Sequence, residues 1–142
     1  MTPRTIYLVK RIETELTSQM TRRLAAFDMT PSQFTVLSSV EDTWSDLSSA
    51  QLARRFLMTP QSMNEIIGIL QRKDWIQRTT DPNHKRILRI NLTAKGKDIL
   101  SICNAAMDEF EQEFFDAFSP EDVSVYRQLM RRLLASQRKA VL

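Results

Sequence analysis

Side chains that could bind a polyanion are concentrated in the middle of the chain. Residues 50–97 contain ten lysines and arginines and three acidic residues, whereas residues 98–126 contain eight acidic residues and no lysine or arginine. A basic block of this kind is the charge distribution expected of a protein that binds nucleic acid. Charge alone leaves a second reading open, which is an ordinary solvated surface with uneven charge.

Covalent chemistry has few candidates in this sequence. The 142 residues include one histidine and one cysteine, so we predict no metal site, no cofactor and no nucleophile with an evident base. An enzyme is therefore not expected. Cys103 is interpreted as a small buried hydrophobe, with a redox-sensing thiol or an inter-subunit disulfide as alternatives.

Because no apolar run is long enough to span a membrane and residues 1–10 do not form a signal peptide, we expect a cytoplasmic protein.

The spacing of apolar residues predicts a mainly α-helical chain. An amphipathic helix is expected over residues 3–27. Serine or threonine, often followed by proline, predicts further helix starts at Thr30, at Ser48 or Ser49, at Thr59, Thr93 and Ser119. Two of these helices are short, separated by about four residues, and the second opens on polar side chains. This order indicates a helix-turn-helix.

One β-hairpin is predicted directly after the helix-turn-helix. Residues 75–79 and 87–92 are rich in strand-forming side chains and flank a basic, turn-rich segment, 80–86. A hairpin in this place is a wing, so the fold class is α+β, a winged helix-turn-helix. Its lobe is expected to cover residues 29–97. Residues 1–28 and 98–142 are expected to form a helical dimerisation region.

Three strings resemble the MarR family of transcriptional regulators. Asp81-Pro82-Asn83-His84-Lys85-Arg86 resembles the family's wing pattern, D-x-x-D-R-[RK]. Leu92-Thr93-Ala94-Lys95-Gly96 resembles the L-T-x-x-G after the wing, and Leu70-Gln71-Arg72-Lys73-Asp74-Trp75-Ile76 resembles the L-x-x-K-G-[LW]-[IV] that ends the recognition helix. The sequence departs from the family at His84, which replaces a wing aspartate, and at Glu65, where relatives often carry arginine.

The resemblance implies a homodimeric bacterial regulator on the nucleoid that represses transcription from a pseudo-palindromic operator in double-stranded DNA. It also implies a small aromatic effector. Phe110, Phe114, Phe115 and Trp44 are candidates for an effector pocket, with an ordinary aromatic core as the alternative. A winged-helix module that binds a protein and no specific DNA is the alternative function.

The recognition helix, residues 60–73, should separate an apolar face from a polar face. At 100° per residue, Met63, Ile66, Ile67 and Leu70 lie on one side, with Gln61, Glu65, Gly68 and Arg72 opposite. Gly68 would allow close approach to a backbone or close packing inside the domain. The predicted DNA contacts are Gln61, Ser62, Asn64 and Arg72 on this helix, His84, Lys85 and Arg86 in the wing, and Arg54 with the helix start at Ser32 and Gln33 on the backbone.

The terminal helices carry apolar stripes that a lone winged-helix domain is not expected to cover. We predict that a second copy of the chain covers them. An internal core is the alternative. The predicted interface residues are Ile6, Val9, Ile12, Leu129, Leu133 and Val141.

Overall fold

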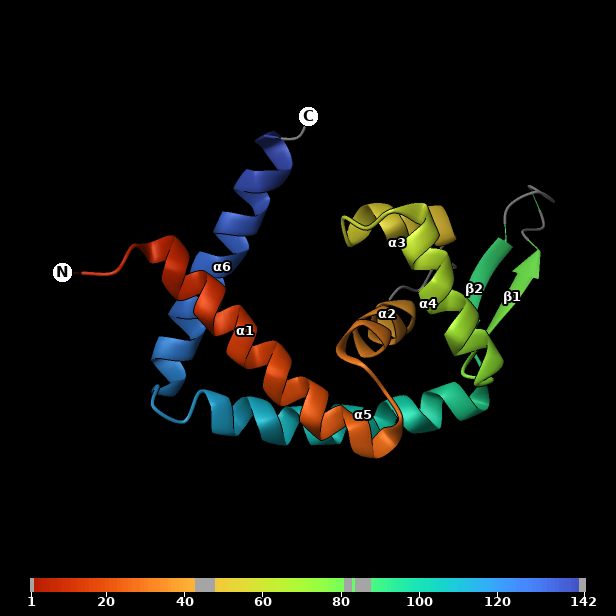
Figure 1. Ribbon diagram of the computed structural model, residues 1–142, viewed down its shortest axis with the longest axis horizontal. Helices are drawn as coiled ribbons and strands as arrows, with labels where there is room; N and C mark the ends of the chain where they lie inside the picture. The colour runs from red at the N-terminus through yellow and green to blue at the C-terminus, as the bar shows by residue number, and fades with distance from the viewer. Residues whose placement is uncertain (1, 43–47, 81–82, 84–87, 141–142) are drawn as a thin grey trace. The chain divides into compact units, whose positions relative to one another are not determined.

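A computed structural model describes residues 2–42, 48–80, 83 and 88–140 of the chain. The chain divides into two compact units, residues 1–107 and residues 108–142 (Figure 1). In chain order the elements are α1 (Thr5–Leu24), η1 (Ala25–Phe27), α2 (Pro31–Asp42), α3 (Ser49–Arg55), α4 (Pro60–Arg72), β1 (Ile76–Thr80), β2 (Leu88–Leu92), α5 (Ala94–Phe114) and α6 (Pro120–Ala140).

The helix starts predicted from serine and threonine are confirmed. In each case the hydroxyl of the residue before the helix accepts a hydrogen bond from the amide three residues later, which satisfies one of the free N–H groups of the first turn. The distances are 3.2 Å at Thr30, 3.2 Å at Ser48, 3.1 Å at Thr59, 2.9 Å at Thr93 and 3.1 Å at Ser119.

The predicted hairpin is also confirmed, with each strand beginning one residue later than expected. The two strands are antiparallel, and Ile76 pairs with Leu92 at the base while Thr80 pairs with Leu88 toward the tip. Ile76 and Ile90 are buried. The alternation of side chains along a strand therefore anchors one face of the hairpin in the domain.

The core of the first unit lies between the helix-turn-helix, α2 and the hairpin. α3 packs on α4 and also contacts β2, while α2 contacts α4 and β2. The side chains buried there include Val36, Leu37, Leu52, Met63, Ile67, Leu70, Trp75, Ile76 and Ile90.

The apolar side chains of α5 divide between a buried and an exposed side. Leu100, Cys103, Met107 and Phe110 are buried, whereas Ile102 is 51% exposed. The apolar residues of α5 fit two neighbouring stripes, and packing selects the one that contains Leu100. The predicted burial of Cys103 is confirmed, and desolvation by burial raises the pKa of its thiol.

The second unit consists of the end of α5, a turn and α6. α6 exposes a row of large apolar side chains whose exposed fractions lie between 40% and 64%: Val125, Leu129, Met130, Leu133 and Leu134. The first turns of α1, in the other unit, likewise expose Ile6, Tyr7, Leu8, Val9 and Ile12. Among the described residues, no helix is long and apolar enough to cross a membrane.

Candidate nucleic-acid interface

The polar face of α4 is available to a partner. Thr59 and Pro60 begin the helix, and its apolar side holds it in the domain through Met63, Ile67 and Leu70, which are fully buried. The opposite side exposes Gln61, Glu65 and Arg72, as the 100° spacing predicted, while Gly68 is half-buried and Asn64 is exposed as well. A helix anchored on one side and polar on the other is the arrangement that places side chains in a DNA groove.

The start of α4 and the tip end of the hairpin lie on the same side of the first unit. Figure 1 shows α4 running away from this side and β1 returning toward it. His84, Lys85 and Arg86, the predicted wing contacts, lie outside the described residues.

The remaining predicted contacts occupy different environments. Arg54 and Ser32 are exposed, and Ser62 is half-buried with its hydroxyl accepting from Thr59 Oγ1 at 2.9 Å. Gln33 is buried. Its side-chain oxygen accepts a hydrogen bond from the backbone amide of Thr30 at 3.2 Å, and the backbone amide of Gln33 donates to Thr30 Oγ1. This reciprocal pair is a capping box, and it holds the start of α2 so that Ser32 is presented to solvent.

Asn64 is exposed but its side chain is already engaged. The Ser49 hydroxyl, in the first turn of α3, donates to Asn64 Oδ1 at 2.5 Å. In the same turn, Gln51 Oε1 accepts from Arg89 Nη1 of β2 at 3.1 Å. Gln51 and Arg89 were not among the predicted site residues, and Ser49 was predicted only as a possible helix cap. The Ser48-x-x-Gln51 spacing carried a signal for a capping box, but the pairing with β2 joins residues 38 positions apart and leaves no local pattern.

The end of α4 is fixed to three other segments. Lys73 Nζ lies 3.1 Å from Asp28 Oδ2, donates to the Asp28 carbonyl and lies 4.6 Å from the centre of the Trp75 ring. The Thr93 amide donates to the Trp75 carbonyl at 3.1 Å. A Cβ added to Gly96 would lie 1.9 Å from that same carbonyl oxygen, so only glycine fits there. These contacts fix the direction of α4 against η1 and α5.

Gly68 makes no comparable close approach. A Cβ added there would meet only Arg72 Nη1, at 3.3 Å, which is the far end of a flexible side chain. Close approach to a backbone and close packing inside the domain were the two predicted reasons for this glycine. Among the described residues, no neighbouring backbone or tightly packed helix lies close enough to account for it. Its place in the middle of α4 therefore costs helix stability without a packing reason.

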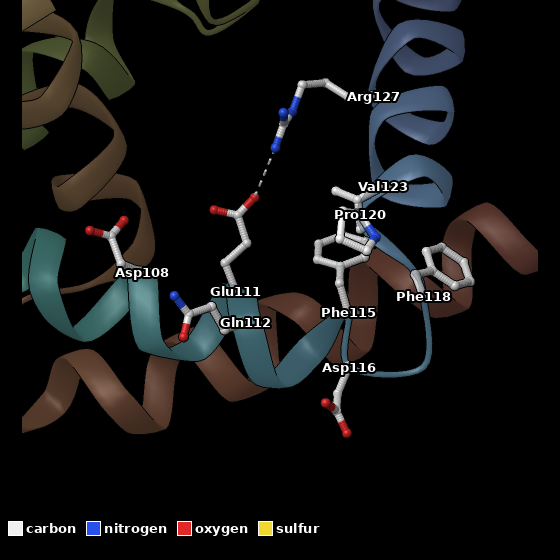
Figure 2. A pocket seen from close by; sticks show the side chains of 9 residues that line it. All are labelled: Asp108, Glu111, Gln112, Phe115, Asp116, Phe118, Pro120, Val123 and Arg127. Carbon is white, nitrogen blue, oxygen red and sulfur yellow. Dashed lines mark ion pairs between the residues drawn. The ribbon is translucent and has the colours of Figure 1, made fainter.

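One open cavity of about 550 Å³ lies inside the second unit, at the turn between α5 and α6 (Figure 2). Phe115, one of the predicted effector contacts, lines it, whereas Phe110 and Phe114 do not, and Trp44 lies outside the described residues. Figure 2 shows Arg127 reaching from α6 toward Glu111 on α5, and their charged atoms are 3.9 Å apart. The other lining residues are Asp108, Gln112, Asp116, Phe118, Pro120 and Val123.

Comparison with known proteins finds a similar family. A model described as "MarR family" matches residues 27–87, which include α2, the helix-turn-helix and β1. This part of the chain is therefore similar to the MarR family, as the sequence strings predicted. MarR of Salmonella typhimurium, named a multiple antibiotic resistance protein, is 25% identical over 132 residues, covering 92% of this chain and 89% of its own.

Two solved structures share the fold of this chain. The complex of S. aureus MepR with DNA superposes with a TM-score of 0.84 at 24% identity, covering 95% of this chain and 99% of the other. A mutant E. coli MarR complexed with operator DNA gives a TM-score of 0.81 at 22% identity, covering 90% of this chain and 91% of the other. The predicted winged helix-turn-helix fold is therefore confirmed.

Proposed function

We propose that this chain is a MarR-family regulator that binds a pseudo-palindromic operator in double-stranded DNA as a homodimer. The observation that supports the proposal most directly is the exposed polar face of α4 beside the hairpin, on a helix whose opposite face is buried. Two relatives with the same fold, MepR and E. coli MarR, have structures in complex with DNA. The basic composition of residues 50–97 supplies the attraction to phosphates.

In this proposal, α4 and the hairpin divide the work of recognition. Gln61, Ser62 and Asn64 read base edges in the major groove, where the amide side chains of glutamine and asparagine pair with adenine. His84, Lys85 and Arg86 contact the minor groove or its phosphates, since arginine is favoured where that groove is narrow. Phosphate contacts come from Arg54, Arg72 and the start of α2 at Ser32, held in place by Gln33.

The exposed apolar faces of α1 and α6 form the dimer interface in this proposal. Residues 1–28 and 98–142 constitute the dimerisation region and residues 29–97 the DNA-binding lobe. Ile6, Val9, Ile12, Leu129 and Leu133 take part in the contact, and each of these five is more than 40% exposed in the single chain. Val141 is included from its sequence position. A two-fold axis would then present two copies of α4 to successive turns of DNA.

The regulator is proposed to act in the bacterial cytoplasm on the nucleoid, without catalytic activity. Its operator binding represses transcription, and a small aromatic effector relieves the repression. Both statements rest on the family resemblance. An effector screen by thermal shift, with simple phenols as the first probes, would test the proposed effector.

Selective binding of DNA is the experiment that tests the proposal. A duplex selected from a random pool, and a scrambled duplex of equal length, are titrated with the protein at two salt concentrations. We expect selective binding that weakens steeply with salt. Replacing Arg86 by alanine should lower operator affinity about tenfold and reduce the salt slope by about one unit. Arg22→Ala removes the same charge from α1 and should change neither quantity.

Glu65 favours a second candidate function, which is a winged-helix module that binds a protein. Glu65 is exposed in the middle of the polar face of α4, where its carboxylate would repel phosphates but could accept a hydrogen bond from cytosine N4. Absence of salt-sensitive, selective DNA binding would favour the module that binds a protein through this face. Selective binding that depends on a cytosine opposite Glu65 would favour the operator.

A further inference from the structure

The first turn of α3 contacts both elements that the proposed function brings to DNA. Ser49 donates to Asn64 Oδ1 on α4 at 2.5 Å, and Gln51 accepts from Arg89 Nη1 on β2 at 3.1 Å. Figure 1 shows α3 beside α4 and the hairpin in the first unit. Two residues of one helical turn therefore link the recognition helix to β2 of the hairpin.

The side chain of Gln51 is held from two directions. Its Oε1 atom also accepts a hydrogen bond from the backbone amide of Ser48 at 2.8 Å, while the backbone amide of Gln51 donates to Ser48 Oγ at 3.2 Å. A carboxamide oxygen has two lone pairs, so it can accept from Ser48 and Arg89 together. The capping box thus orients Gln51 before Arg89 is considered, and Arg89 meets an acceptor that is already in place.

These hydrogen bonds are exposed, so they add little to the stability of the fold. The buried contacts of Leu52, Met63 and Ile67 hold α3 against α4 without them. What the exposed bonds add is direction: they restrict how the hairpin can tilt against α3 and how Asn64 lies on α4. A misplacement of one contacting element by about 1 Å is enough to weaken a recognition site.

We propose that Gln51 and Ser49 are positioning residues that hold the wing and the recognition helix in register for adjacent grooves of DNA. Arg89 acts through Gln51, and neither Gln51 nor Ser49 contacts DNA itself. The inference rests on the proposed function, because it concerns how an operator is fitted. It adds residues that the contact surface of α4 and the wing does not contain.

A double-mutant cycle on Gln51 and Arg89 tests the inference. Gln51→Met keeps the size of the side chain but removes the acceptor, and Arg89→Met removes the donor. Affinities for the selected duplex and for scrambled DNA are measured, and circular dichroism melts establish that each variant is folded. We expect Gln51→Met to lower the ratio of specific to non-specific affinity about five- to tenfold, because loss of folded protein alone would reduce both affinities equally.

Three further readouts separate positioning from direct contact. Gln51→Met should have no additional effect in the Arg89→Met background, as expected when one residue acts through the other. The salt slope should stay unchanged in both single variants, because no phosphate contact is lost. Gln51→Glu, which preserves the cap and the acceptor for Arg89, should keep hydroxyl-radical protection at the wing, whereas Gln51→Met should lose it while protection by α4 remains.

Matched controls use the same changes at exposed positions of α5. Gln112→Met and Ser101→Ala should leave the specificity ratio unchanged, while Ser49→Ala should lower it and alter only base pairs under α4. A fall in the salt slope of Arg89→Met, or an unchanged ratio in Gln51→Met, would overturn the inference and leave the proposed function standing. Failure of the unaltered protein to bind DNA selectively would overturn both.

Discussion

α4 and α6 are both amphipathic helices, yet they treat their apolar sides in opposite ways. α4 buries Met63, Ile67 and Leu70 completely within its own chain. α6 leaves Leu129, Leu133 and Leu134 more than half exposed. Apolar spacing predicts that a helix has a stripe to cover, but it does not say what covers the stripe. The winged-helix region contains its own covering elements, whereas in our proposal a second copy of the chain covers α6.

The largest expected effect comes from charging the uncovered face of α6. Burying a leucine completely contributes about 1.5–3 kcal/mol. In a two-fold dimer, the double variant Leu129→Asp and Leu133→Asp replaces four leucines. Because roughly half of each leucine side chain is already covered in the single chain, these replacements should cost about 4 kcal/mol of dimer stability. The dimer dissociation constant should rise about a thousandfold, measured by analytical ultracentrifugation.

Two added charges elsewhere provide the control for that experiment. Thr35→Asp with Gln71→Asp, at exposed positions of α2 and α4 outside the proposed dimerisation region, should leave the dimer dissociation constant near that of the unaltered protein. If the α6 variant stays dimeric, the comparison between a self-covered helix and a partner-covered helix is wrong.

An intermediate effect is expected inside the winged-helix region, at Gly96. Helix propensity alone predicts that Gly96→Ala stabilises α5. The added Cβ would, however, lie 1.9 Å from the Trp75 carbonyl oxygen, so the backbone must shift, and we expect a loss of about 2–3 kcal/mol in the free energy of unfolding. Urea denaturation at two protein concentrations measures the loss and shows whether it is independent of dimer formation.

Gly68→Ala is the matched control, because its Cβ meets only the flexible end of Arg72. This variant should gain up to about 1 kcal/mol of stability. Opposite signs at the two glycines would show that packing in this region is fixed by its own backbone. Equal gains would mean that the contact between Trp75 and Gly96 yields easily.

The smallest effect is expected at Leu57, an exception to the comparison. This leucine is 89% exposed although it lies in the self-covered region, and its φ of 53° is in the left-handed range. Leu57→Gly removes the strain but adds freedom to the unfolded chain, so the net gain should be about 0.5–1 kcal/mol. Thermal unfolding measures the gain, and an unchanged sedimentation coefficient would show that this exposed leucine is no interface.

Much of the fold was predictable because its signals are local. Every helix start marked by serine or threonine is confirmed, since a cap depends only on a residue and the amides just after it. Which side of α5 is buried could not be predicted in this way, because Ile102 and Leu100 offer nearly equivalent faces and only contacts between distant segments select one. The link from Gln51 to Arg89 has the same origin and could not be read along the chain.

The candidate site was predictable to a similar degree. The exposed face of α4 followed from helical geometry, as did the burial of Met63 opposite Gln61. Gln33 was assigned to DNA on its position alone, although Thr30-x-x-Gln33 is a capping-box spacing that also predicts the bonds the structure contains. The resemblance to the family supplied the wing residues, for which no periodicity argument exists.

The start of α1 differs from the other helix starts. Arg4 precedes it in extended conformation with no side-chain hydrogen bond, whereas the five later α-helices each begin with a capping hydroxyl. Uncapped ends open easily, and the apolar residues of these first turns are 41% to 63% exposed. In hydrogen-exchange terms, the amides of residues 5–9 should therefore exchange first in dilute protein and become protected as concentration rises.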